Sequence, residues 1–251
     1  MTFPINYGLL LTTLVVLAKT TSFVFVAGPF ALPVIPRSVK VALAIALAMA
    51  GAKAVGSLGP LSSSALVSEI FLQLVTGAVV GFVVNVFFNI GISAGSEVGL
   101  FGGFSAPPSI DPLSYNQVPV TGQFFGMIWA TLFFTSGADL ITLHGLLQFD
   151  TTAVLSQPEI GIVVIMKSVS TLMGAALQIA APILAILFLS QVLVGVLTKV
   201  APTLNPFSFA FPVQIVLSLT LMSVSVLVLP NVLAGAVHYI LAAEHDLMAG
   251  A

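Results

Sequence analysis

Charge is the scarcest property of this sequence. Only 6% of its 251 residues are Asp, Glu, Lys or Arg, whereas 59% are hydrophobic. Soluble domains carry about a quarter charged residues, and a soluble chain of this length still exposes roughly a quarter of its surface to water. Six basic and eight acidic side chains cannot cover such a surface. The apolar residues must therefore face lipid or equally apolar protein, which predicts a polytopic integral membrane protein.

Features of enzymes and of nucleic-acid-binding proteins are also missing. Cysteine is absent, which excludes disulfides, thiolate metal sites and cysteine nucleophiles. The net charge of −2 provides no basic footprint for nucleic acid. There is no P-loop or dinucleotide fingerprint, and the G-x-S-x-G match at Gly91–Gly95 falls inside a glycine repeat of an apolar segment. We predict no enzymatic activity, no cofactor and no nucleic-acid partner.

Long apolar runs are abundant instead. A helix needs about 20 apolar residues to cross the hydrocarbon core, and these runs lack the alternation of membrane β-strands. The sequence predicts an all-α fold of about six helical segments in one membrane domain, residues 1–251. The segments are 5–28, 39–57, 66–96, 120–148, 160–199 and 207–242. The longest contain Pro182, Pro212 and Pro230, which predict kinks or helical hairpins.

Basic residues in short loops indicate the orientation. Arg37 and Lys40 lie between the first two segments, and Lys199 lies between the last two. Because cytoplasmic loops carry an excess of Lys and Arg, we expect both termini outside and the odd-numbered loops in the cytoplasm.

Polar residues and glycines follow a four-residue repeat in the third segment, which places them on one ridge of a helix. The row is Glu69, Gln73, Gly77, Gly81, Asn85, Asn89, Ser93 and Glu97, and Gly91, Gly95, Gly99 and Gly103 continue the glycine spacing. Small residues let helices approach closely, and amides bond across helices. The row predicts helix packing, within this chain or against other subunits. A row this long winds around the helix and so meets more than one neighbour.

Three charged residues, Lys19, Asp139 and Lys167, lie within apolar runs. A charge at a helix centre costs about 2.5–3.5 kcal/mol on insertion scales, so none of them is expected to face lipid. They indicate either an ion or proton path or, as we favour, structural pairing or snorkelling to the interface. A secondary transporter would use such midplane groups, but the chain shows no two-fold internal repeat.

Four motifs, in order, resemble the FliR family of flagellar type III export-gate proteins. The first connection, Pro29 and Val34–Lys40, resembles that family at Pro36 and Lys40. The central stretch contains Ala94-Gly95, Gly99, Gly103, Ser105-Ala106 and Asp111-Pro112, followed by Q-V-P-V-T-G-Q-F at Gln117–Phe124. The last motif is A-P-x-x-N-x-F…F-P, at Ala201, Pro202, Asn205, Phe207, Phe211 and Pro212. The resemblance covers almost the whole chain. The sequence departs from the family at Ala138-Asp139, where Gly-His is usual. It departs again after Ala94-Gly95, where the family has an acidic or amide residue and this chain has Ser96, with Glu97 one position later.

This resemblance implies one subunit of an export gate that also contains FliP-like and FliQ-like membrane subunits. Unfolded flagellar proteins would pass through the lumen, in the bacterial inner membrane at the flagellar basal body. The Q-V-P-V-T-G-Q-F motif favours the flagellar system. The equivalent subunit of a virulence type III secretion system stays as the first alternative, and a secondary transporter as the second.

The resemblance also implies that the irregular stretch 101–119 forms a loop that plugs the lumen. Non-helical backbone at membrane depth is tolerated only where protein or a water-filled cavity surrounds it. An apolar tip suits a constriction that excludes water and ions, whereas a plain surface loop would more often be charged. The predicted gate residues are the hinge candidates Gly102 and Gly103, and Phe104, Pro107, Pro108, Ile110, Asp111 and Pro112.

Overall fold

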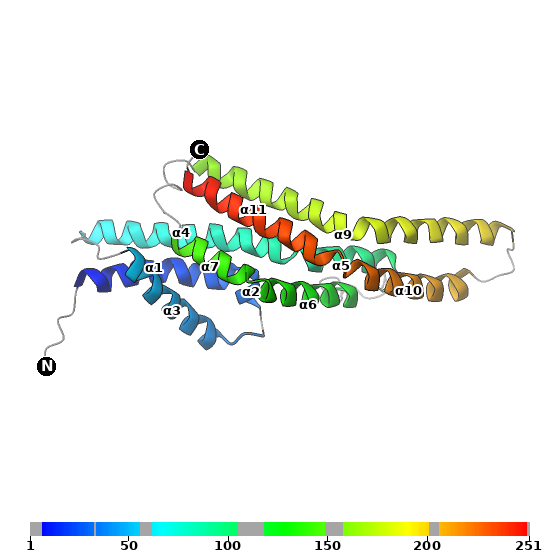
Figure 1. Ribbon diagram of the computed structural model, residues 1–251, viewed down its shortest axis with the longest axis horizontal. Coiled ribbons are helices and arrows are strands. Elements are labelled where there is room, and N and C mark those ends of the chain that lie inside the picture. Colours follow the sequence, from blue (N-terminus) through cyan, green and yellow to red (C-terminus); the bar gives the residue numbers. More distant parts are fainter. Residues whose placement is uncertain are drawn as a thin grey trace. The chain divides into compact units, whose positions relative to one another are not determined.

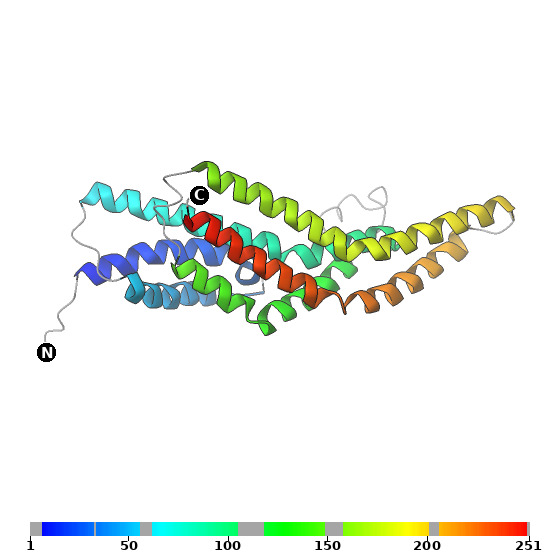
Figure 2. The same cartoon turned by 45° about the horizontal axis from the view of Figure 1, so that its top comes forward.

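A computed structural model describes residues 7–32, 34–55, 62–104, 118–148, 158–200 and 206–249. Every regular element within these ranges is a helix, as Figures 1 and 2 show. The helices are α1 (Tyr7–Val26), α2 (Gly28–Ala31), α3 (Arg37–Val55), α4 (Ser63–Phe88), α5 (Ile90–Phe101), α6 (Val120–Thr135), α7 (Ala138–Gln148), α9 (Pro158–Val200), α10 (Pro206–Ser225) and α11 (Leu229–Ala249). The predicted all-α fold is confirmed.

The apolar helices are long enough for a membrane protein. Three are long and apolar enough to cross a membrane, and the number rises to five if each of two bent pairs is one span. The three are α1, the α4–α5 stretch Ser63–Phe101 and the part of α9 at Ile165–Val200. The predicted segment 39–57 corresponds to α3, which is not among the three.

Two predicted segments are broken rather than straight. The α6–α7 pair bends by 65° and the α10–α11 pair by 57°. Gly137 stands at the first break with φ +75°, a left-handed conformation that costs side-chain-bearing residues energy. Pro182 and Pro212, by contrast, lie inside α9 and α10 without ending them. The 43 residues of α9 make about 65 Å of helix, roughly twice the thickness of the hydrocarbon core.

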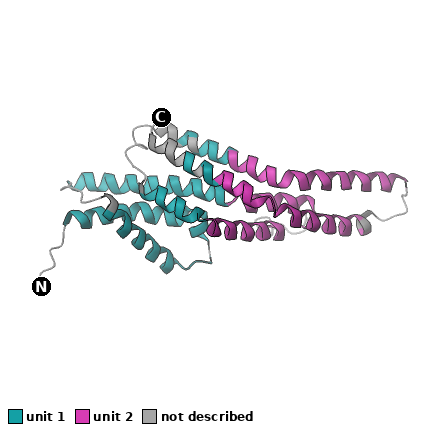
Figure 3. Ribbon diagram, in the orientation of Figure 1, with its two compact units in different colours: residues 1–88, 137–170, 237–251 teal, residues 89–136, 171–236 magenta. Residues whose placement is uncertain are grey.

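The chain divides into two compact units, coloured separately in Figure 3. Unit 1 contains residues 1–88, 137–170 and 237–251, and unit 2 contains residues 89–136 and 171–236. In unit 1, α1 packs against both α4 and α3. In unit 2, α5 packs against α6.

The core of unit 1 depends on small residues. A Cβ on Gly77 would overlap the carbonyl oxygen of Lys19, and a Cβ on Gly81 would lie 3.2 Å from that of Phe23. These glycines therefore let the backbones of α1 and α4 touch. On the other side of α1, the Thr20 hydroxyl donates a hydrogen bond of 2.9 Å to the carbonyl of Ala44.

The connection between α2 and α3 is tied by a lysine, and we expect its loss to be costly. The buried Lys40 ammonium donates a hydrogen bond of 2.8 Å to the Ala31 carbonyl. Replacing Lys40 with methionine leaves that carbonyl without this donor, which should cost about 1–3 kcal/mol of stability. Thermal unfolding of the solubilised protein measures the loss. The control is Lys53→Met, because Lys53 is exposed on the same helix. Equal stability of the two variants would contradict the structural role of Lys40.

Candidate functional site

The candidate site is the helical hairpin of α5 and α6, which flanks the predicted gate loop in unit 2. Of that loop, Gly102, Gly103 and Phe104 at the start and Val118 and Pro119 at the end are described. The predicted gate residues Pro107, Pro108, Ile110, Asp111 and Pro112 lie outside the described residues. The site is therefore built from the two helices that hold the loop.

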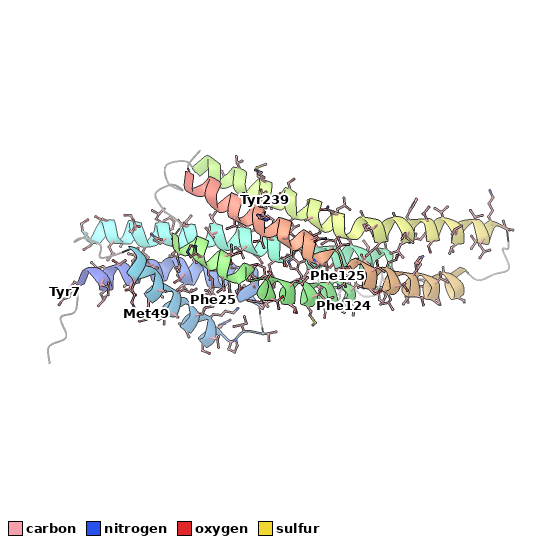
Figure 4. All side chains as sticks on the ribbon, viewed as in Figure 1. Tyr7, Phe25, Met49, Phe124, Phe125 and Tyr239 are labelled. Atoms are coloured by element: carbon pink, nitrogen blue, oxygen red, sulfur yellow. The ribbon has the colours of Figure 1, made fainter. Side chains whose placement is uncertain are left out.

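Glycines hold α5 against α6. A Cβ on Gly95 would lie 2.5 Å from the carbonyl oxygen of Thr121, and a Cβ on Gly99 would overlap the Thr121 hydroxyl. A Cβ on Gly91 would lie 2.5 Å from Trp129. Phe125 and Trp129 are fully buried in this contact, whereas Phe124, labelled beside Phe125 in Figure 4, is exposed. The hairpin thus brings two backbones together at the base of the loop.

Helix α10 also contacts the start of the predicted gate loop, at Gly102 and Gly103. The Gly102 amide donates to the Val98 carbonyl at 2.8 Å, and the Phe104 amide donates to Gly99 at 3.1 Å. A Cβ on Gly102 would lie 3.0 Å from Ser218, and one on Gly103 would lie 3.3 Å from the Phe211 ring. Phe211 was predicted only as a family-motif position, and Ser218 was not predicted. Ser218 is one of several hydroxyl residues in this apolar run, with Thr220, Ser223 and Ser225, so the sequence did not single it out.

The polar row of the third segment meets different neighbours along its length. Glu69 accepts a hydrogen bond of 3.0 Å from the Gln73 amide, and Gly77 and Gly81 lie against α1. Asn85 lies next to Gly28, and Gly95 and Gly99 face α6. Asn89 separates α4 from α5, in which Ser93 is half-buried. Two oxygens near the loop base, Oε2 of Glu97 and Oγ1 of Thr121, are buried without a hydrogen bond among the described residues.

The three charged residues of the apolar runs lie in unit 1. Lys19 is buried in α1, and Asp139 occupies the first turn of α7 with its Oδ1 buried and unbonded within the described ranges. The Lys167 ammonium stands 5.7 Å from the centre of the Tyr239 ring. No cluster of three or more His, Asp or Glu among the described residues is arranged to hold a metal ion.

The family-motif positions that the structure describes lie at or near the beginnings of α3 and α10. Pro36 directly precedes α3 and Lys40 lies in its first turn, whereas Phe207, Phe211 and Pro212 lie in the first two turns of α10. Ala201, Pro202 and Asn205 lie outside the described residues.

Comparison with known proteins decides the family. The profile of the family described as "Bacterial export proteins, family 1" matches residues 10–239 of this chain. The chain belongs to this family. The match takes in both helices of the hairpin, the loop between them and α10, so the candidate site lies wholly within the family's extent in this export protein.

Its relatives come from two kinds of system. The chain is 28% identical to the surface presentation of antigens protein SpaR of Shigella flexneri over 150 residues, which cover 59% of each chain. It is 26% identical to the flagellar biosynthetic protein FliR of Escherichia coli over 193 residues, covering 75% of this chain and 74% of that protein. With FliR of Bacillus subtilis it shares 28% identity over 172 residues, covering 64% and 66%. The predicted family is confirmed.

The left-handed glycine of the loop base provides a test within this export protein. Gly103 has φ +79° and contacts Phe211, whereas Gly137 has φ +75° and nothing within 4 Å of an added Cβ. Alanine at either position should cost about 1–2 kcal/mol of stability through strain alone. Only Gly103→Ala should also reduce protein export, because only there does the new methyl group meet α10. Export reduced equally by both variants would contradict a special role for the loop base.

Proposed function

We propose that this chain is a subunit of a type III protein export gate. It assembles with FliP-like and FliQ-like membrane subunits into a channel in the bacterial inner membrane, and unfolded proteins pass through that channel. The observation that carries the proposal is the family match over residues 10–239. The relatives named FliR and SpaR support it. The gate performs no chemistry of its own, and the energy for export comes from other components.

The structure supports an assembled rather than a solitary protein. Helix α9 is about twice as long as one crossing requires. Large apolar side chains such as Met173, Phe188 and Val200 are exposed along the part of α9 whose side chains the structure describes. Lipid covers about 30 Å of such a helix, so other apolar subunits are needed for the remainder.

Within this function, the loop 101–119 closes the lumen. Its two ends are fixed by the glycine contacts of α5 and α6 and by the packing of Gly103 on Phe211. Apolar contacts of Phe104 and of the loop tip with neighbouring subunits hold the closed state, and an entering substrate displaces the loop.

We further propose that the parent system is flagellar, because the FliR alignment covers more of the chain than the SpaR alignment does. The test is deletion of the gene in its own host, with secretion and motility measured. Loss of both flagellar filaments and secreted flagellar proteins supports the flagellar gate. Loss of secreted virulence proteins with intact motility favours the gate of a virulence system. Normal secretion of both sets would contradict an export role.

A further inference from the structure

Glu97 is the only charged residue of α5 and α6, and one of its carboxylate oxygens is buried. This oxygen, Oε2, has no hydrogen bond among the described residues. A buried carboxylate is costly unless hydrogen-bond donors, and a cation for its charged form, stand beside it. Glu97 lies in the apolar stretch Ser63–Phe101, where lipid tails can supply neither. The carboxylate of Glu97 therefore lacks the partner that its burial requires.

Glu97 lies on the side of α5 that is opposite α6. Gly95 and Gly99 both contact α6, and Glu97 is two residues from each of them, which is about 200° around the helix. Ile90, two turns earlier on nearly the same side as Glu97, is fully buried, whereas Phe101, one turn later, is exposed. Glu97 thus stands where this side of α5 passes from the interior of the chain to its surface.

The lysines and arginine of this chain do not serve that carboxylate. All six of these residues lie within the described ranges, and none of them donates a hydrogen bond to Oε2 of Glu97. Unit 2 itself contains a single lysine and no arginine, and this Lys199 is exposed in the last turn of α9. A cation for Glu97 must therefore come from another molecule.

We infer that Glu97 pairs with a Lys or Arg side chain of a neighbouring membrane subunit that covers this end of α5. The inference rests on the proposed function, because the pair forms only in the assembled gate. A basic side chain supplies both the positive charge and the N–H donors that the buried oxygen lacks. Leu100 and Phe101, which are exposed close to Glu97, provide an apolar rim that keeps water from the pair. An apolar helix would leave the oxygen unpaired, and an anionic lipid headgroup would repel it.

The pairing is tested by the amount of other membrane subunits that the tagged chain recovers from gently solubilised membranes, at equal membrane levels of each variant. Glu97→Gln should recover severalfold less than the wild type, and Glu97→Lys at least tenfold less. Wild-type recovery by Glu97→Lys would overturn the inference, and where that variant does not accumulate, wild-type recovery by Glu97→Gln would do so. The control is Lys199→Gln, which should recover the wild-type amount. A loss equal to that of Glu97→Gln would assign the cation to this chain and overturn the inference.

A second measurement identifies the partner residue by charge exchange. In cells that carry Glu97→Lys, second-site mutations that restore secretion are selected and mapped. We expect replacements of a Lys or Arg by Glu or Asp in another membrane subunit of the gate, because they restore an opposite pair of charges. Failure to obtain such an exchange would overturn the pairing. The proposed function fails separately from this inference, because it fails when the wild-type chain itself recovers no other subunit.

Discussion

Replacing Gly95 with valine is expected to abolish protein export. The first atom of the new side chain would lie 2.5 Å from the carbonyl oxygen of Thr121 and 2.8 Å from Cβ of Phe125. Neither neighbour can give way, because one is helix backbone and the other belongs to the fully buried side chain of Phe125. Overpacking of this kind typically costs about 1–3 kcal/mol and occasionally more. It would push α6 away from α5 and displace both ends of the predicted gate loop.

The matched control is a glycine of a helix that has open space around it. Gly235 lies inside α11 with nothing within 4 Å of an added Cβ. Because valine is a slightly better helix former than glycine, Gly235→Val should leave stability unchanged or improve it by a few tenths of a kcal/mol. The measurements are the membrane level of each variant and the amount of protein secreted. Full secretion by Gly95→Val would show that the α5–α6 contact is not needed for export.

The second large effect is expected at the gate loop. If the loop closes the lumen, replacing Phe104 and Ile110 together with glycine removes the apolar groups that exclude water. Cells should then lose potassium and take up a membrane-impermeant dye while the protein stays at its normal level. The control is Val34→Gly, which removes an exposed apolar side chain from another non-helical connection, in unit 1. A leak no greater than that of the control would count against the plug.

The helical segments could be predicted from the sequence, because long apolar runs leave few alternatives in a membrane. The breaks were harder to locate. Proline breaks helices more strongly than glycine does, yet α9 continues through Pro182. The chain bends instead next to Gly137 and ahead of Pro230. A proline inside a long helix costs energy that packing can offset. The residue before a proline is itself restricted, which gave a weak signal for the second break.

The partners of the glycine row could not be predicted. Gly77 and Gly95 are 18 residues apart, about five turns, so they fall on one face of a straight helix. They nevertheless meet different helices, because Gly77 lies against α1 in unit 1 and Gly95 lies against α6 in unit 2. The spacing predicts close packing but does not identify the neighbouring helix, because that depends on tertiary contacts far apart in the sequence. The packing of Gly103 on Phe211 is of the same kind.

The central claim, that this chain is one subunit of an export gate, is tested most directly by purifying what accompanies it. A tag placed after Ala251 allows recovery from gently solubilised membranes of the native host, followed by identification of the bound proteins. We predict one large, stable particle that contains FliP-like and FliQ-like subunits, and that does not form with the Gly95→Val variant. Recovery of the chain alone, as a monomer or a simple dimer, would contradict the export-gate account.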